Sequence, residues 1–116
     1  DMEKLSVIVP CFNEQETLQD YYDAISKVRE TLLGKECELQ VILVDDGSKD
    51  KTLAKMKELS GQCSWIRYIS FTRNFGKEAA IYAGLTHAEG EYVSLMDVDL
   101  QDPPELLPKM YAMVKN

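Results

Sequence analysis

Hydrophobic residues follow two alternating patterns along this chain, and the alternation predicts its secondary structure. Short runs rich in β-branched and aliphatic residues are typical of buried strands. They lie at 5–9, 39–44, 65–70 and 92–96, and Pro10 is expected to end the first. After each run comes a longer stretch whose apolar residues recur every three or four positions, which is typical of an amphipathic helix. The predicted order is therefore βαβαβαβα.

Local signals place the ends of the predicted helices. Asn13 stands three residues before a glutamate and has the character of an N-cap for the first helix, which Gly34 ends. Ser48 or Asp50 is expected to cap the second helix. Asp102 is the predicted N-cap of the last helix, and the proline after it would occupy the first helical position.

Strands separated by helices favour parallel pairing with right-handed crossovers. Three of the four runs are nearly continuous in apolar residues, as expected when helices cover both faces of a sheet. No linker or block of charge marks a boundary, so residues 1–116 are predicted to form one α/β domain with four parallel strands. In such folds ligands bind beyond the carboxyl ends of the strands. The residues that follow each strand are therefore the candidate site.

Asp97 and Asp99 follow the fourth strand. In an extended segment, carboxylates at i and i+2 point the same way, and Gln101 would add a third oxygen on that side. Such ligands suit Mg²⁺ or Mn²⁺, which would neutralise a diphosphate in an acidic cleft. Taken alone, the motif favours a solvated acidic turn, with Asp102 as a helix cap.

Asp45 and Asp46 follow the second strand. Adjacent carboxylates at the end of a buried strand repel each other unless a ligand or donor satisfies them. A base N–H or a ribose hydroxyl is one such donor, and a turn capped by Ser48 is the alternative. Asn13 and Glu14, after the first strand, also have a plain alternative, since acidic residues favour the first turn of a helix.

Arg73 and Lys77 follow the third strand, in a glycine-containing loop that opens a helix. Such a loop supplies cations and backbone amides to a phosphate, or is simply solvated. No GxGxxG and no GxxxxGK[ST] pattern occurs in the sequence. Neither a standard dinucleotide site nor a P-loop is therefore predicted.

Composition narrows the class of partner. The chain has 116 residues, 45% hydrophobic and 28% charged, which is typical of one globular domain. With 13 basic and 20 acidic residues the net charge is −7, which disfavours nucleic acid as a partner. A small anion bound through a metal ion or backbone dipoles is compatible with this charge. Cys11, Cys37 and Cys63 contain no CxxC pair, so we expect free thiols in a reducing cytoplasm.

Taken together, the four strand-end segments are far more specific than any one of them. They read VPCFNE at 9–14, VDDGS at 44–48, RNFGKE at 73–78 and DVDLQDPPE at 97–105. This set, in this order, resembles the family 2 inverting glycosyltransferases of GT-A fold. The likeness covers essentially the whole chain and is greatest to the bactoprenol glucosyltransferase and dolichyl-phosphate mannosyltransferase group. It implies the Rossmann-like, nucleotide-binding half of a GT-A domain.

The resemblance also implies roles for the candidate residues. Those expected to bind the nucleotide are Pro10, Asn13, Glu14, Asp45, Asp46, Arg73, Lys77 and Asp97. Those expected to bind Mn²⁺ or Mg²⁺ are Asp97, Asp99 and Gln101. Within the first set, Asp46 or the neighbouring Asp45 would contact the base. Arg73 and Lys77 would lie near the diphosphate of the donor.

The implied reaction transfers a sugar, with inversion, from a nucleotide diphosphate sugar to a polyprenyl phosphate or glycan. A UDP-sugar is the favoured donor, and GDP-mannose is the second. The resemblance places the acceptor site and the general-base carboxylate beyond Asn116. We therefore expect no catalytic residue within 1–116, and a parent protein at the cytoplasmic face of a membrane.

Two other classes of function stay open at this stage. A noncatalytic module that binds a nucleotide sugar or a partner would use the same strand ends. A phospho-acceptor signalling domain also gathers aspartates around Mg²⁺, but it needs the acidic pair after its first strand. Here the pair follows the second strand, so this interpretation is the weaker one.

Overall fold

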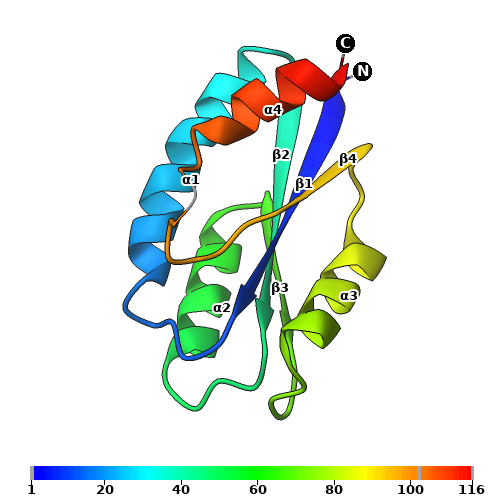
Figure 1. The fold of residues 1–116 in the computed structure, drawn as a ribbon. Coiled ribbons are helices and arrows are strands. Elements are labelled where there is room, and N and C mark those ends of the chain that lie inside the picture. Colours follow the sequence, from blue (N-terminus) through cyan, green and yellow to red (C-terminus); the bar gives the residue numbers. More distant parts are fainter. Residues whose placement is uncertain (1, 102, 116) are drawn as a thin grey trace.

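Four strands and four helices alternate along the chain in the computed structural model, which describes residues 2–101 and 103–115 (Figure 1). The elements are β1 (Glu3–Cys11), α1 (Leu18–Leu33), β2 (Cys37–Asp45), α2 (Thr52–Gln62), β3 (Ile66–Ser70), α3 (Lys77–His87), β4 (Tyr92–Leu95) and α4 (Leu106–Lys115). The predicted βαβαβαβα order is confirmed. None of the helices in the described ranges is both long enough and apolar enough to cross a membrane.

The strands form one parallel sheet in the order β3-β2-β1-β4. β1 pairs with β2 along its whole length, from Glu3 opposite Cys37 to Cys11 opposite Asp45. Its pairing with β4 is shorter and ends where Ile8 lies opposite Leu95. The chain thus winds outward through β2 and β3 and then returns to the other side of β1. The strand order reverses between β1 and β4, which is where Rossmann-like sheets bind ligands.

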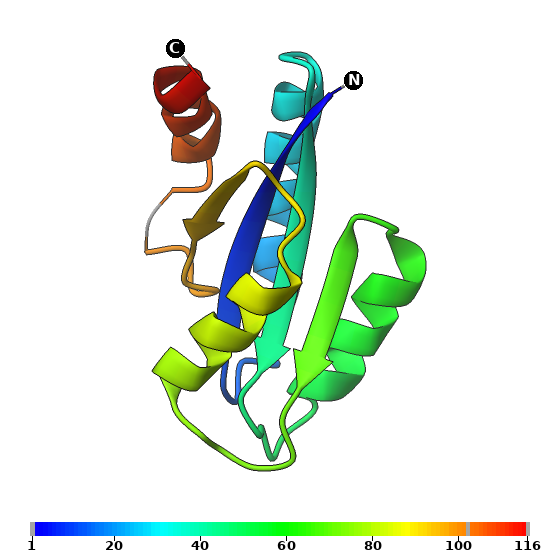
Figure 2. The same ribbon diagram turned by 90° about the vertical axis from the view of Figure 1, so that its right-hand side faces the viewer.

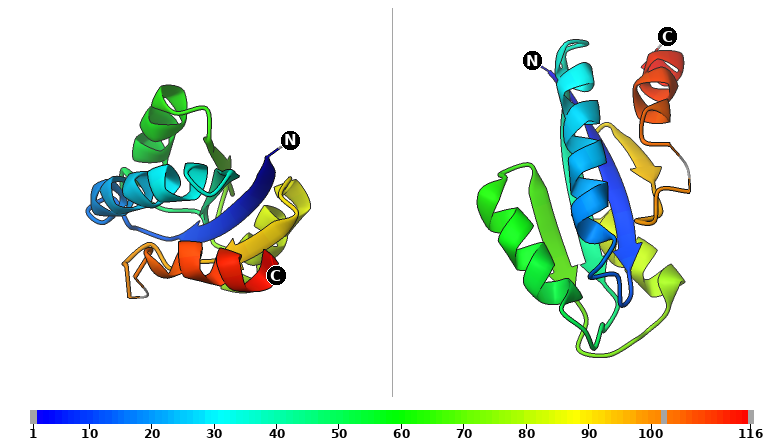
Figure 3. Two further views of the ribbon diagram at one scale, coloured as in Figure 1. Left: turned by 90° about the horizontal axis from the view of Figure 1, so that it is seen from above. Right: turned by 90° about the vertical axis from the view of Figure 1, so that its left-hand side faces the viewer.

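Alternate residues of the central strands contribute to two separate cores. Val7 and Val9 of β1 pack in a large cluster with residues of α1, α2 and α4. Ile8 and Ile42 lie in a smaller cluster with Ala80 of α3. Figure 2 shows α3 in front of the sheet, and the right panel of Figure 3, seen from the opposite side, shows α1 there. The prediction that helices cover both faces is confirmed.

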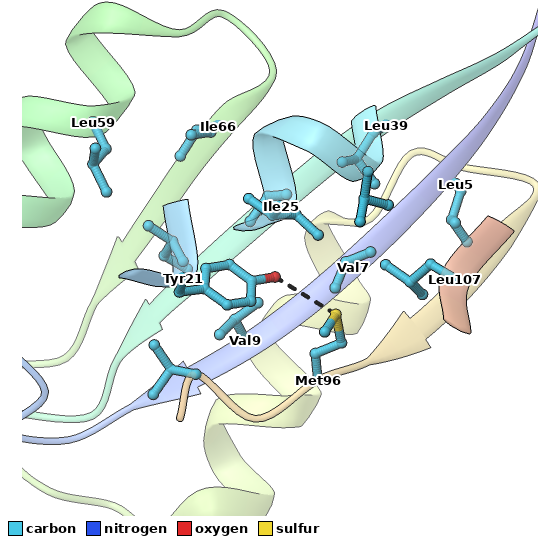
Figure 4. Packing of buried hydrophobic residues seen from close by; sticks show 14 of the residues in the cluster. Leu5, Val7, Val9, Tyr21, Ile25, Leu39, Leu59, Ile66, Met96 and Leu107 are labelled. Atoms are coloured by element: carbon cyan, nitrogen blue, oxygen red, sulfur yellow. Dashed lines mark hydrogen bonds between the residues drawn. The ribbon is translucent and has the colours of Figure 1, made fainter. Parts of the chain in front are cut away.

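The larger core fixes the segment that follows β4. Tyr21 of α1 is 1% exposed, and its hydroxyl donates to the Met96 sulfur at 3.7 Å (Figure 4). Burial raises the pKa of Tyr21 above its ordinary range, so the phenol stays neutral. Met96 and Val98 are both buried in this core. Asp97, which lies between them, is therefore held in place by the packing of its two neighbours.

The last helix is joined to the first strand by polar contacts. The Tyr111 hydroxyl donates to a Glu3 carboxylate oxygen at 2.6 Å, and Lys115 Nζ lies 3.3 Å from the same oxygen. The bond from Tyr111 lowers the pKa of Glu3, and it raises the pKa of Tyr111 to about 12. These contacts hold the start of β1 against α4.

The prediction that Pro10 ends β1 is wrong, because the strand continues to Cys11. The Ile8 carbonyl accepts a hydrogen bond from the Met96 N–H on the β4 side of the strand. Backbone groups of alternate residues face the same side, so the Pro10 nitrogen also faces that side. β4 has already ended at Leu95, so the missing N–H of proline interrupts no pairing.

The predicted starts of two helices are also wrong. Asn13 does not cap α1, which begins at Leu18, because the Asn13 side chain instead accepts a hydrogen bond from the Lys49 N–H. Pro103 is not the first residue of α4, which begins at Leu106. The Pro103 carbonyl instead accepts a hydrogen bond from the Leu106 N–H, which closes a turn before the helix. Asp102 lies outside the described residues.

Gly34 is the C-cap of α1, as predicted. The N-cap of α2 is Lys51 rather than Ser48 or Asp50, although the Asp50 carboxylate accepts a hydrogen bond from the N–H of Thr52, the first residue of the helix. The three cysteines are free thiols, as predicted.

Candidate functional site

A pocket of about 170 Å³ opens at the carboxyl ends of the strands, where the strand order reverses. All four strand ends contribute to it. The residues that line it are Pro10, Cys11, Phe12, Glu14, Asp46, Lys77, Asp97, Val98 and Asp99. Six of the candidate residues from the sequence are therefore brought together, namely Pro10, Glu14, Asp46, Lys77, Asp97 and Asp99.

Negative charge dominates this pocket. Among the described residues that line it, four are carboxylates and one is a cation, Lys77. Lys77 Nζ lies 3.1 Å from an Asp97 carboxylate oxygen. Burial, followed by the charges of Asp99 and Asp50, raises the pKa of Glu14. The carboxylates therefore outnumber the cation, and a bound metal ion would reduce this excess of negative charge.

The segment from Asp97 to Asp99 turns rather than running extended as predicted. The Leu100 N–H donates to the Asp97 carbonyl at 3.5 Å, and Val98 is buried between the two aspartates. Because Val98 packs inward, both carboxylates stay at the pocket wall. Gln101 is exposed, and its N–H donates to Asp99. The part of Gln101 in metal binding stays a prediction.

The donor atoms of this pocket fit a divalent ion that is completed by a ligand. Within residues 2–101 and 103–115, no three His, Cys, Asp or Glu side chains converge closely enough to hold an ion by themselves. Mg²⁺ is commonly held by one or two carboxylates, with substrate phosphates and water as its other ligands, and Mn²⁺ also prefers oxygen. Asp97 and Asp99 supply such carboxylates on one wall of the pocket.

The Asp46 carboxylate holds the loop that leads into α3. It accepts hydrogen bonds from the Phe75 N–H at 2.8 Å, from the Gly76 N–H at 3.1 Å and from the Asn74 amide at 3.2 Å. Asp46 is only 5% exposed, and it lies as an anion at the N-terminal end of α3. Two of the loop amides that the sequence predicts for a phosphate, those of Phe75 and Gly76, are therefore already engaged within the protein.

Asp45 takes part in a separate network behind the pocket. It is 2% exposed, and its two oxygens accept from the Ser48 N–H at 2.9 Å and the Ser70 hydroxyl at 3.2 Å. The repulsion expected between Asp45 and Asp46 is thus offset, because each carboxylate has its own hydrogen-bond donors. Asp45 is not among the residues that line the pocket.

The turn after β2 packs against two other loops. Gly47 has a φ of +73°, and a Cβ atom there would lie 2.2 Å from the carbonyl carbon of Arg73. On the other side, the Asn13 N–H donates to the Ser48 hydroxyl and the Glu14 N–H donates to the Thr52 hydroxyl. These contacts hold the backbone of Asn13 and Glu14 in place, and so position the Glu14 side chain at the pocket.

Sequence reasoning missed several residues that shape the site. The sequence predicts Ser48 only as a cap and gives no role to Thr52 or Asn74, although each of the three bonds to a loop of the site. The available signal was the density of serine, threonine and asparagine in segments that follow strands, since these side chains bond to nearby backbone. Cys11 was also missed. Burial, and then the charge of Glu14, raises the pKa of its thiol, so it stays protonated and is not an anionic ligand.

Arg73 and Asn13 lie beside the pocket rather than among its lining residues. The Arg73 guanidinium carbon lies 4.6 Å from the centre of the Phe75 ring. Asn13 has a φ of +54° and bonds to the turn after β2. Their roles in nucleotide binding stay predictions.

Comparison with known proteins identifies related sequences. The profile of Glycosyl transferase family 2 matches residues 6–116. A bactoprenol glucosyl transferase of Shigella phage SfV is 42% identical over 107 residues, which are 92% of this chain and 34% of that protein. The putative glycosyltransferase CsbB of Bacillus subtilis is 42% identical over 103 residues, which are 89% of this chain and 30% of that protein. This chain therefore spans about a third of the length of these curated relatives.

Solved structures share the fold. The mannosyltransferase PcManGT from Pyrobaculum calidifontis, in complex with GDP-Man and Mn²⁺, aligns with a TM-score of 0.70 at 25% identity, covering 89% of this chain and 34% of that one. S. aureus TarS 1-349 in complex with UDP-GlcNAc aligns with a TM-score of 0.71 at 25% identity, covering 97% and 31%. With its Rossmann-like GT-A core and a family match over nearly its whole length, the chain belongs to glycosyl transferase family 2.

Proposed function

We propose that this chain is the nucleotide-sugar-binding part of an inverting glycosyltransferase that uses Mn²⁺ or Mg²⁺. The observation that carries the proposal is the acidic pocket at the strand ends, where Asp97 and Asp99 share a wall and Glu14, Asp46 and Lys77 surround them. A UDP-sugar is the favoured donor and GDP-mannose the second. Both kinds of nucleotide sugar are supported by neighbours of the same fold, which are solved with UDP-GlcNAc and GDP-Man.

In this proposal each wall of the pocket has its own task. Asp97 and Asp99 bind the divalent ion, with Gln101 as the third predicted ligand. Such an ion, when bound, neutralises a diphosphate and so favours its departure as a leaving group. Lys77, together with Arg73 in the neighbouring loop, adds positive charge near the same diphosphate.

The nucleoside is proposed to bind along the opposite wall. Pro10 near the end of β1 and Glu14 in the loop that follows both line the pocket, and Asn13 belongs to the same loop. Asp46 faces the pocket and is therefore the member of the acidic pair that we assign to the base. Asp45 is buried behind it and supports the turn through its bond from Ser48.

The acceptor is proposed to be a polyprenyl phosphate or a glycan. An acceptor oxygen attacks the anomeric carbon in line as the bond to the nucleotide diphosphate breaks, which inverts that carbon. A polyprenyl phosphate oxygen is already ionised and needs little help from a base. Residues 1–116 alone are expected to bind nucleotide without transferring sugar, and we place the parent protein at the cytoplasmic face of a membrane.

Calorimetry with UDP, GDP and CDP, each with and without Mn²⁺, tests the proposal on the complete protein. We expect one of these nucleotides to bind only when Mn²⁺ is present. Asp99→Asn is expected to weaken that binding about tenfold or more, since it removes a charged ligand. Glu38→Gln is the matched control, because it also removes one negative charge but from an exposed residue on β2. Absence of Mn²⁺-dependent binding for all three nucleotides would refute the proposal.

Sugar transfer separates this proposal from the noncatalytic alternative. A nucleotide-sugar-binding module without catalysis would bind the nucleotide and Mn²⁺ in the same way. The complete protein is therefore given a radiolabelled UDP-sugar, or GDP-mannose, together with a short polyprenyl phosphate or a glycan. Transfer to either acceptor supports the enzyme, whereas binding without transfer to any acceptor supports the alternative.

A further inference from the structure

Lys77 stands at a position that the helix does not favour. It is the first residue of α3, and the N-terminal end of a helix repels a positive charge. Its ammonium reaches across the pocket to Asp97, with Nζ 3.1 Å from the carboxylate oxygen. The Lys77 and Asp97 side chains are 61% and 41% exposed, so an incoming ligand reaches both. The ion pair of Lys77 is therefore made with a residue of the pocket, and an incoming ligand can replace it.

The contact occupies an oxygen that the proposed metal site needs. A carboxylate oxygen that pairs with an ammonium group is not free to coordinate an ion at the same moment. Lys77 is the single cation among the described residues that line the pocket, opposite Glu14, Asp46, Asp97 and Asp99. In the ligand-free pocket it therefore reduces the repulsion among these carboxylates.

We propose that Lys77 is a tethered counter-ion, which leaves Asp97 when a divalent ion binds and then pairs with the diphosphate of the donor. This inference rests on the proposed function. The flexible four-carbon stem of lysine allows one ammonium group to serve both partners in turn. Lys77 thus weakens binding of the ion alone and strengthens binding of the ion together with a nucleotide. The two ligands are thereby coupled through one side chain.

Lys77 can be replaced with little expected effect on the stability of the fold. Exposed ion pairs contribute little to stability, and removing a positive charge from the start of a helix is favourable. Lys77→Met is therefore expected to unfold in urea at the midpoint of the unaltered protein. Lys57→Met is the matched control, since Lys57 is an exposed lysine on α2 away from the pocket. Lys77→Arg retains the charge and tests rescue.

The experiment measures two affinities of the complete protein. Free Mn²⁺ is titrated without nucleotide by electron paramagnetic resonance, and UDP and GDP are titrated by calorimetry at saturating Mn²⁺. For Lys77→Met we expect Mn²⁺ alone to bind about two- to fivefold tighter, which is the range of exposed ion pairs. The better-bound nucleotide is expected to bind about fivefold weaker. Lys57→Met should match the unaltered protein in both titrations, and Lys77→Arg, which keeps the charge, should lie closer to it than Lys77→Met does.

The outcomes separate this inference from the proposed function. If the unaltered protein binds Mn²⁺ and a nucleotide, but Lys77→Met binds Mn²⁺ alone no tighter, Lys77 is not a counter-ion that the metal displaces. Tighter Mn²⁺ binding with unchanged nucleotide affinity also overturns the inference, because the transfer to the diphosphate is then missing. If the unaltered protein binds neither Mn²⁺ nor a nucleotide, the proposed function itself fails.

Discussion

Asp46→Asn removes one charged oxygen from the most densely bonded side chain of the site. Asparagine has the same shape and keeps one acceptor, which can still meet the Phe75 N–H. Its NH₂ group then replaces the oxygen that now accepts from the Asn74 amide at 3.2 Å and from the Gly76 N–H at 3.1 Å, and Gly76 keeps only its longer contact of 3.2 Å with the other oxygen. Donors face donors at that position, and because Asp46 is almost fully buried, no bulk water can satisfy them.

The expected cost follows from these contacts. A hydrogen bond to a charged group contributes about 1.5–3 kcal/mol, and leaving a buried donor unpaired costs about 1–3 kcal/mol. Part of this loss is offset, because neutralising Asp46 removes its repulsion from Asp45. The net loss is expected to be about 2 kcal/mol. That is a sizeable share of the roughly 5–15 kcal/mol by which such a domain is stable.

Urea unfolding followed by circular dichroism measures this loss. Hydrogen exchange gives a second and local readout, since the Gly76 amide, which loses the shorter of its two contacts, should lose protection in Asp46→Asn, whereas the Phe75 amide should keep it. Glu38→Gln, which removes the same charge from an exposed site on β2, should stay within about 0.5 kcal/mol of the unaltered protein. The reasoning is refuted if Asp46→Asn is as stable as this control and the Gly76 amide remains protected.

Two further substitutions test the turn after β2 and the contact between α4 and β1. Gly47→Ala is expected to lower stability by more than about 2 kcal/mol, because of its φ of +73° and the 2.2 Å approach to Arg73. Gly76→Ala, with a φ of +103° but open space around the added Cβ, carries backbone strain of about 1–3 kcal/mol without a clash, so it should be less destabilising than Gly47→Ala, and an equal urea midpoint for both would contradict this account. Tyr111→Phe removes the bond that holds the pKa of Glu3 below its ordinary 4.5. A lowered pKa stabilises the fold above pH 4.5 and loses that effect as the pH falls, so the unfolding midpoint of Tyr111→Phe should fall less steeply as the pH is lowered below 4.5; parallel curves would rule this out.

The strands were predictable because burial on both faces leaves a local trace. Continuous apolar runs such as 39–44 mark a strand whichever neighbour it pairs with. The ends of elements depend on distant parts of the chain instead. Asn13 is diverted from its cap by the N–H of Lys49, and Pro10 stays in β1 because β4 ends early on that side. Neither contact has any signal in the residues next to it.

The location of the candidate site was predictable, but the hydrogen bonds within it were less so. Asp97, Asp99 and Glu14 meet in one pocket because parallel strands end at one edge of the sheet. The bonds of Asp46 were not predictable, since its partners Phe75 and Gly76 lie about 30 residues away, beyond another helix and strand. A carboxylate that binds a ligand and one that holds a loop look the same in a sequence.

The central place of β1 has a consequence for how the protein is synthesised. β1 leaves the ribosome before the other three strands, yet its partner on one side is β4, with Leu5 opposite Tyr92, and three helices and two strands are made between them. Until Tyr92 emerges, that side of β1 is a row of unpaired backbone groups, of the kind that recruits strands from other chains. Pairing across so long a stretch is slow. The pace of translation between these strands therefore sets how long the nascent chain is open to aggregation.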